Sequence, residues 1–113
     1  MAEYLLLLNV TDDEASAVNP ERSKEHAEFA QQHGAALRGG NRLRPADTAT
    51  SVRRNDAGEP VVTDGPFYET KEVLAGYYLV EAADLDEAIA IAKDVPCGAG
   101  GGIEVRPIWP MNE

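Results

Sequence analysis

Four stretches of the chain have the apolar pattern of β-strands. Residues 4–10 (YLLLLNV) are an almost unbroken apolar run, which predicts a central strand buried on both faces. Residues 73–82 (VLAGYYLVEA) are dense in aromatic and β-branched residues and predict a second long strand. Residues 36–44 and 102–108 predict two further strands, the first of them irregular around its Gly-Gly pair.

Two other segments have apolar positions at helical spacing and clear start signals. Asn19 and Pro20 begin the first predicted helix, as N-cap and first helical residue, and the helix runs to about residue 33. Asp84 and Glu87 form a capping box at the start of the second helix. The predicted apolar face of this second helix consists of Leu85, Ala88, Ile89, Ala92 and Val95.

Residues 48–63 predict a β-hairpin inserted between these two halves. Strand-forming residues 48–53 and 60–63 flank the sequence NDAG, which is a strong turn signal. The order is therefore β-α-β, then the hairpin, then β-α-β. We expect one α+β domain over residues 1–113, with a ferredoxin-like βαββαβ plan in which both helices lie on one face of an antiparallel sheet.

This plan leaves the other face of the sheet without helices. The apolar runs at residues 5–8 and 77–80 put apolar side chains on both faces, and such a surface is rarely left in water. A second copy of the chain, packed sheet against sheet, is the simplest cover. The sequence therefore predicts a homodimer.

Composition and charge narrow the classes of partner and compartment. Ten Lys and Arg against twenty Asp and Glu leave a net charge of −10, which disfavours nucleic acid and anionic membranes as partners. Cys97 is the only cysteine, so no disulfide can form within the chain. The N-terminal apolar run lacks a basic flank and is too short to span a membrane. We expect a cytoplasmic protein.

His26 is the residue best suited to chemistry. An imidazole titrates near neutral pH, and a carboxylate partner would orient it for general acid–base work, although a histidine on a helix flank often only packs. His33 lies about 10.5 Å further along the helix axis, too far to bind one metal ion together with His26. The sequence carries no metal-ligand motif, so we predict no metal site and no cofactor.

The stretch DGPFYETKE (residues 64–72) combines a turn signal with several functional side chains. Asp64 can accept hydrogen bonds within its own turn and the proline restricts φ, so a turn alone explains the first three residues. Phe67 is expected to anchor the segment in the core. The alternative is that Asp64 and Lys71 lie at the mouth of a cleft near His26, because loops on a rigid sheet often carry sites.

Three stretches resemble one known family. DGPFYETKE, GYYLVEAADLDEAIAIA and GGGIEVRPI are similar to motifs of the YCII-related proteins of the DGPF (DGPFAETKE) subgroup, and the resemblance spans nearly the whole chain. It implies a ferredoxin-like fold that assembles as a dimeric α+β barrel. Most proteins of this subgroup are bacterial and have no assigned activity.

The resemblance also implies candidate site residues. In the wider family a helix-borne histidine and an aspartate are the proposed site residues, and His26 takes the histidine position. Asp64 is the first choice for the aspartate, and Asp94, in a stretch like the family's Asp-Pro with one residue inserted, is the second. Further ligand-binding candidates are Phe67, Tyr68, which replaces the usual alanine, Lys71 and Asp94.

Two functions follow from these observations. The first is a cofactor-independent small-molecule enzyme or a small-ligand-binding protein, with His26 as general acid or base. The enzyme would be lyase-like, because one related branch removes chloride from a chlorinated muconate. The second is a non-catalytic dimeric interaction or regulatory module, linked for example to transcription control, because related domains are fused to sigma factors.

Overall fold

A computed structural model describes residues 1–67 and 71–111 of the chain. Within these residues, strands and helices follow the predicted order, with a short helix α1 and a 3-10 helix η1 in addition. The bounds are β1 Ala2–Thr11, α1 Asp12–Ser16, α2 Pro20–Gln32, β2 Leu37–Arg42, η1 Ala46–Thr48, β3 Thr50–Arg54, β4 Pro60–Asp64, β5 Glu72–Ala82, α3 Leu85–Lys93 and β6 Gly102–Pro107.

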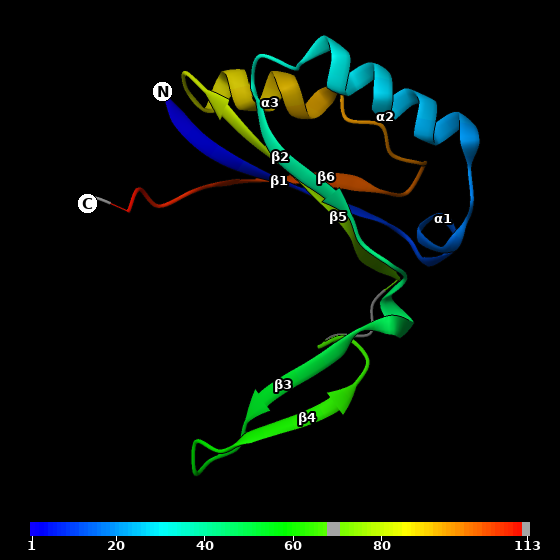
Figure 1. The fold of residues 1–113 in the computed structure, drawn as a ribbon, viewed down its shortest axis with the longest axis vertical. Helices are drawn as coiled ribbons and strands as arrows, with labels where there is room; N and C mark the ends of the chain where they lie inside the picture. The colour runs from blue at the N-terminus through cyan, green and yellow to red at the C-terminus, as the bar shows by residue number, and fades with distance from the viewer. Residues whose placement is uncertain (68–70, 112–113) are drawn as a thin grey trace.

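Four strands form an antiparallel sheet in the order β2-β5-β1-β6. The two long strands, β1 and β5, lie in the middle, and α2 and α3 cover one face of the sheet (Figure 1). The chain is therefore a mixed α+β protein, and its strand order is compatible with the predicted ferredoxin-like plan.

The core lies between the two helices and the face of the sheet that they cover, here called the inner face. Side chains alternate between the faces of a strand, so every second residue of β1 is buried: Tyr4, Leu6, Leu8 and Val10. The first three of these belong to the core cluster together with Phe29 of α2, Val80 and Ala82 of β5, and Ala88, Ile91, Ala92 and Val95 of α3 and its C-terminal end.

Both predicted helix starts are confirmed. The side chain of Asn19 accepts a hydrogen bond from the backbone N–H of Arg22, and the side chain of Asp84 accepts one from the N–H of Glu87. Each bond satisfies a backbone donor that the first turn of a helix leaves without a partner. The helices therefore begin where local chemistry provides a cap.

The predicted buried face of α3 is partly wrong. Leu85 is 48% exposed and Ile89 is 36% exposed, whereas Ile91, which the prediction omitted, is buried. The buried stripe runs through Ala88, Ile91 and Ala92, at the three- and four-residue spacing of one helix face. Ile89 follows Ala88 by about 100° of rotation, and so it points away from the sheet.

The other face of the sheet, here called the outer face, carries no helix. Leu5 and Leu7 of β1 lie opposite Leu79 and Tyr77 of β5 on this face, and all four side chains are half-buried. The predicted burial of residues 4–10 is therefore confirmed for the inner face, which the helices cover, whereas full burial of the outer face stays a prediction that depends on the second copy.

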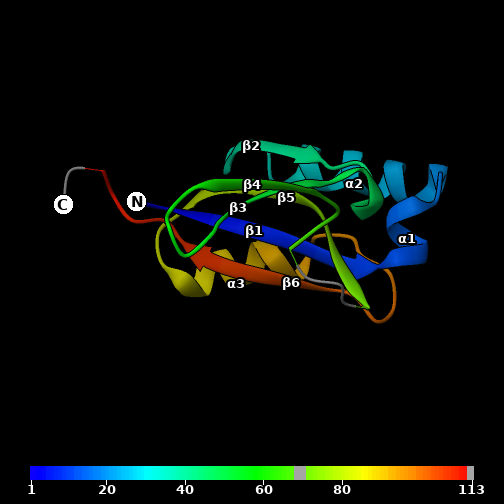
Figure 2. The same ribbon diagram turned by 90° about the horizontal axis from the view of Figure 1, so that it is seen from below.

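The predicted hairpin is confirmed and forms a separate two-stranded sheet, here called the arm (residues 50–64). Among the described residues, β3 and β4 pair only with each other. The arm lies on the side of the main sheet opposite to the helices (Figure 1), and from below it lies across the outer face (Figure 2). The arm is therefore displaced from the core.

Candidate functional site

A pocket of about 340 Å³ lies on the inner side of the sheet, between α2 and strands β2 and β5. Leu8 and Val10 of β1 contribute apolar surface to it, and Arg22 and His26 of α2 contribute polar groups. Cys97, in the segment after α3, also lines it. The volume and the mixture of apolar surface with a few polar groups are typical of small-molecule sites.

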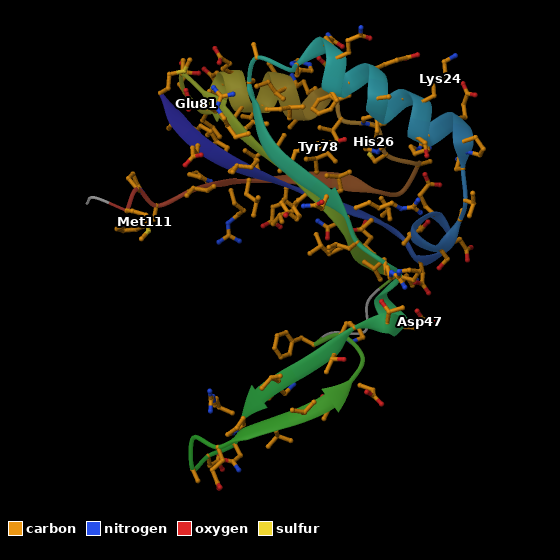
Figure 3. The ribbon with its side chains drawn as sticks, in the orientation of Figure 1. Lys24, His26, Asp47, Tyr78, Glu81 and Met111 are labelled. Atoms are coloured by element: carbon orange, nitrogen blue, oxygen red, sulfur yellow. The ribbon has the colours of Figure 1, made fainter. Side chains whose placement is uncertain are left out.

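His26 and Tyr78 meet in this pocket. Nδ1 of His26 lies 2.7 Å from Oη of Tyr78, a hydrogen-bond distance, and Figure 3 shows the two side chains between α2 and the sheet. Helix α2 supplies His26, and Tyr78 lies on the inner face of β5, opposite Leu6. Phe29 lies one helical turn after His26, and the centroid of its ring is 4.8 Å from the centroid of the Tyr78 ring. The pair is thus held by packing as well as by its hydrogen bond.

Gly40 of β2 leaves the space that the Tyr78 ring occupies. A Cβ atom at position 40 would lie 2.7 Å from Cδ1 of Tyr78 and 2.9 Å from the backbone oxygen of Tyr77. Carbon atoms in contact are normally separated by about 3.5–4.0 Å. The Gly-Gly pair that makes this strand irregular in sequence therefore has a role in positioning Tyr78.

Burial keeps both members of the pair uncharged near neutral pH. Burial lowers the pKa of His26, and the positive charges of Arg22 and Arg42 lower it further, while the carboxylate of Glu25 opposes them. Burial also raises the pKa of Tyr78. At pH 7 the pocket therefore holds a neutral imidazole hydrogen-bonded to a neutral phenol.

Two arginines shape the rim of the pocket. Arg22 donates from Nε to Glu14 at 2.8 Å and from Nη1 to Glu25 at 3.0 Å, so its charge is largely compensated. Arg42 of β2 donates from Nη2 to the backbone oxygen of Ala17 at 3.0 Å, which ties the segment after α1 to the edge of the sheet. Both side chains line the pocket.

Asp64, the first choice for the carboxylate partner, is not brought to His26 within one chain. It lies at the end of β4 in the arm, is exposed, and does not line the pocket. The following Gly65 has φ of +101°, a conformation that favours glycine, and its N–H donates to the backbone oxygen of Ala49 at 2.7 Å. The structure thus places Asp64 at the end of a strand, directly before a bend that depends on Gly65.

Asp94, the second choice, contacts the other histidine. Asp94 Oδ2 accepts a hydrogen bond from Nε2 of His33 at 2.9 Å, which joins the C-terminal ends of α2 and α3. Asp94 therefore pairs with the histidine at the C-terminal end of α2 and not with His26. Neither Asp94 nor His33 lines the pocket.

Phe67 and Lys71, two of the remaining candidates, also lie outside the pocket lining. Phe67 is 53% exposed, with the guanidinium of Arg53 4.4 Å from its ring centroid, so the prediction of a core anchor is wrong. It follows the end of the arm and does not belong to the core cluster described above. Lys71 is exposed. Tyr68 falls outside the described residues.

The sequence prediction missed Tyr78, the residue that actually contacts His26. A signal was present, because the alternation of β5 puts Tyr78 on the same face as Val80, two residues away, and Val80 belongs to the core. No comparable signal identifies Arg42, which is exposed and reaches the pocket from the edge strand β2.

The part of the chain that the structure describes offers neither a metal-binding cluster nor a membrane-spanning helix. Among residues 1–67 and 71–111, no group of three or more His, Cys, Asp or Glu side chains is arranged to hold a metal ion. In the same part of the chain, no helix is both long and apolar enough to cross a membrane.

Comparison with known proteins identifies the family. The profile of the YCII-related domain matches residues 2–112, and the chain therefore belongs to the YCII-related family. An uncharacterised protein of Rhizobium meliloti (strain 1021) is 49% identical over 63 residues, which are 54% of this chain and 51% of that protein. The match thus spans about half the length of this relative, whose name assigns it no activity.

Proposed function

We propose that this YCII-related chain binds a small molecule in the pocket beneath α2, and that His26 and Tyr78 act there as an acid–base pair. The observation that carries the proposal is the 2.7 Å contact between Nδ1 of His26 and Oη of Tyr78 inside a cavity of about 340 Å³. A proton-transfer group must lie within hydrogen-bond reach of its partner and of a bound molecule. The first condition is met by the 2.7 Å contact, and the place of both side chains in the pocket lining supports the second.

The neutral state of the pair gives it two complementary functions. When Nδ1 of His26 donates to Oη of Tyr78, the lone pair of Nε2 can accept a proton and the phenol O–H can donate one. A ligand that loses a proton at one atom and gains one at another would find both groups in the same pocket. Because the pKa of His26 is lowered, the imidazole stays in its basic form at neutral pH.

This proposal replaces the His–Asp pair expected from the family resemblance with a His–Tyr pair. The assigned roles need no metal and no cofactor, since the proton moves between side chains and ligand. The polar lining from Arg22, Arg42 and Ser23 would orient the bound molecule, while Leu8 and Val10 contact its apolar part. Reactions of the lyase class, in which a proton is removed next to a leaving group, suit such a pair.

The finer assignments are part of the same proposal. The stretch DGPF at residues 64–67 supports membership of the DGPF subgroup, and the strand order supports the ferredoxin-like plan. The apolar outer face supports a homodimer that buries it as a dimeric α+β barrel. The cytoplasmic location and the regulatory alternative stay predictions.

The test begins with a thermal-shift screen of small organic molecules against the purified chain, followed by affinity and turnover measurements on each hit. His26→Gln and Tyr78→Phe should each lower turnover about 100-fold or more, which is the usual contribution of a positioned acid or base. His33→Gln is the matched control, because His33 pairs with Asp94 away from the pocket.

The proposal is overturned if His26→Gln and Tyr78→Phe, shown to be folded by circular dichroism, leave both affinity and turnover unchanged. It is also overturned if His33→Gln lowers them equally. A ligand that binds without turnover, and whose affinity falls only in the two pocket variants, supports the binding role and excludes the acid–base role for that ligand.

A further inference from the structure

We propose that the arm of each chain packs on a second copy of the same chain, so that two copies joined through their outer faces also exchange arms. The inference rests on the homodimer proposed above and is independent of the chemistry of the pocket. It assigns a binding surface to a part of the molecule that the pocket leaves without a role.

The arm is a mixed polar and apolar hairpin with exposed valines and little support from its own chain. Val52 and Val62 form a cross-strand pair on one face and are 53% and 66% exposed, and Val61, on the opposite face, is 43% exposed. No other element among the described residues packs extensively on β3 or β4. An isolated two-stranded hairpin is marginally stable in water, so an arm of this kind needs a surface to pack against.

The position of the arm indicates which surface this is. The arm lies on the same side of the main sheet as the outer face, as Figures 1 and 2 both show. Packed sheets lie about 10 Å apart, so a second copy bound to the outer face would occupy the side of the molecule on which the arm lies. Such a copy comes within reach of the arm, and by two-fold symmetry the arm of the second copy comes within reach of the first.

The area of the outer face gives an independent reason. At about 4.8 Å of width per strand and 3.3 Å of length per residue, the four strands of the sheet have an outline of about 500 Å². A stable interface usually buries about 800 Å² on each partner. The 500 Å² is a flat outline, and the accessible surface of the same patch is larger, so the outer face is of the size that a stable dimer buries. The arm, with an outline of about 160 Å², adds contact area with the same second copy.

Cross-linking tests the contact directly. A benzophenone amino acid replaces Val62 in the full chain, and a matched control carries it at Val18, which is 92% exposed in the segment between α1 and α2. An equimolar mixture of ¹⁴N- and ¹⁵N-labelled protein is allowed to exchange subunits and is irradiated, and cross-linked peptides are identified by mass spectrometry. We expect covalent dimers with mixed isotope pairs from position 62 and none from position 18.

Two cross-linking results overturn the proposal. Cross-links from position 62 confined to peptides of the same chain would mean that the arm folds back on its own outer face. A wild-type protein that is dimeric by sedimentation equilibrium, yet gives no cross-link from position 62, would mean that the arm remains in solvent.

Substitutions in the arm and in the outer face distinguish the contributions of the two surfaces to the stability of the dimer. Val62→Lys should raise the dimer dissociation constant at least about tenfold, because one buried valine is lost in each of two symmetric contacts, whereas Val18→Lys should leave it unchanged. Leu7→Lys, in the centre of the outer face, should abolish the dimer. A dimer weakened by Leu7→Lys but not by Val62→Lys contradicts the role of the arm and leaves the face-to-face dimer standing. A wild-type monomer at about 50 μM overturns both, since it implies a dissociation free energy below about 6 kcal/mol.

Discussion

Replacing Gly40 by alanine should disturb the His26–Tyr78 pair, whereas the same replacement at Gly39 should not. The new Cβ at position 40 would lie 2.7 Å from Cδ1 of Tyr78, about 1 Å inside normal carbon–carbon contact. At position 39 the nearest atom is Cβ of Leu79 at 3.9 Å, which is an ordinary contact. Both variants reduce the freedom of the unfolded chain by the same amount, so the difference in stability between them reports the overlap of the new Cβ with the Tyr78 ring and with the backbone oxygen of Tyr77.

The expected magnitude follows from the cost of overpacking. Inserting a methyl group where the neighbours cannot move usually costs about 1–3 kcal/mol, whereas an unstrained Gly→Ala change stabilises by about 0.4–1 kcal/mol. Gly40→Ala should therefore be less stable than Gly39→Ala by about 1–3 kcal/mol or slightly more. The free energy of unfolding is measured by urea titration, with sedimentation to check that Gly39→Ala, on the outer face, has the oligomeric state of the wild type.

A spectroscopic measurement links this cost to the pair. The ¹⁵N shifts of the His26 ring should change in Gly40→Ala, because the displaced Tyr78 ring carries Oη away from Nδ1, and should stay unchanged in Gly39→Ala. The reasoning is refuted if the two variants are equally stable and both retain the wild-type ¹⁵N shifts. That result would mean that β2 accommodates the new methyl group without loss of stability, and that Gly40 does not position Tyr78.

Three further predictions concern the core, the pH dependence and a helix cap. Leu6→Ala should lower the free energy of unfolding by about 2–5 kcal/mol, because Leu6 is fully buried. Leu85→Ala should lower it by about 1 kcal/mol or less, because Leu85 lies on the exposed side of α3. If urea titrations gave equal losses for the two variants, Leu85 would be buried, and the described exposed side of α3 would be wrong. Because the pKa of His26 is lowered on folding, the unfolded chain binds its proton more tightly, and stability should fall as the pH drops through 6.5 toward the lowered pKa. Urea titrations between about pH 8 and about pH 5 should show this loss in the wild type and less of it in His26→Gln, and parallel profiles would argue against the shift. Asp84→Ala should lower the melting temperature, with a cost of about 1 kcal/mol, and an unchanged temperature would show that the cap bond of α3 contributes nothing.

Local patterns predicted the elements of this protein well. The caps at Asn19 and Asp84, the turn at residues 55–58 and the apolar runs of β1 and β5 each depend on a few neighbouring residues. Short-range hydrogen bonds and side-chain periodicity act over the same few residues, so the sequence by itself was sufficient for them. The inserted hairpin was predicted for the same reason.

The burial of these elements was predicted less well. The apolar run of β1 indicates apolar neighbours on two faces, but it does not say whether they belong to the same chain. Leu85 and Ile89 have the helical spacing of a buried face, yet the sheet covers Ala88, Ile91 and Ala92 instead. Which side of a helix is buried depends on the rotation of the whole helix against the sheet, and that rotation is decided by long-range packing.

The candidate site shows the same division. The sequence by itself determined that His26 lies on a helix above an antiparallel sheet, and that a bend at a glycine directly follows Asp64. Only the tertiary structure decided that Tyr78 contacts His26, that Asp94 contacts His33, and that Asp64 extends away on the arm. The first of these two histidine contacts spans 52 positions of the sequence and the second spans 61. Both depend on the register of the strands and the rotation of the helices, which a short stretch of sequence does not determine.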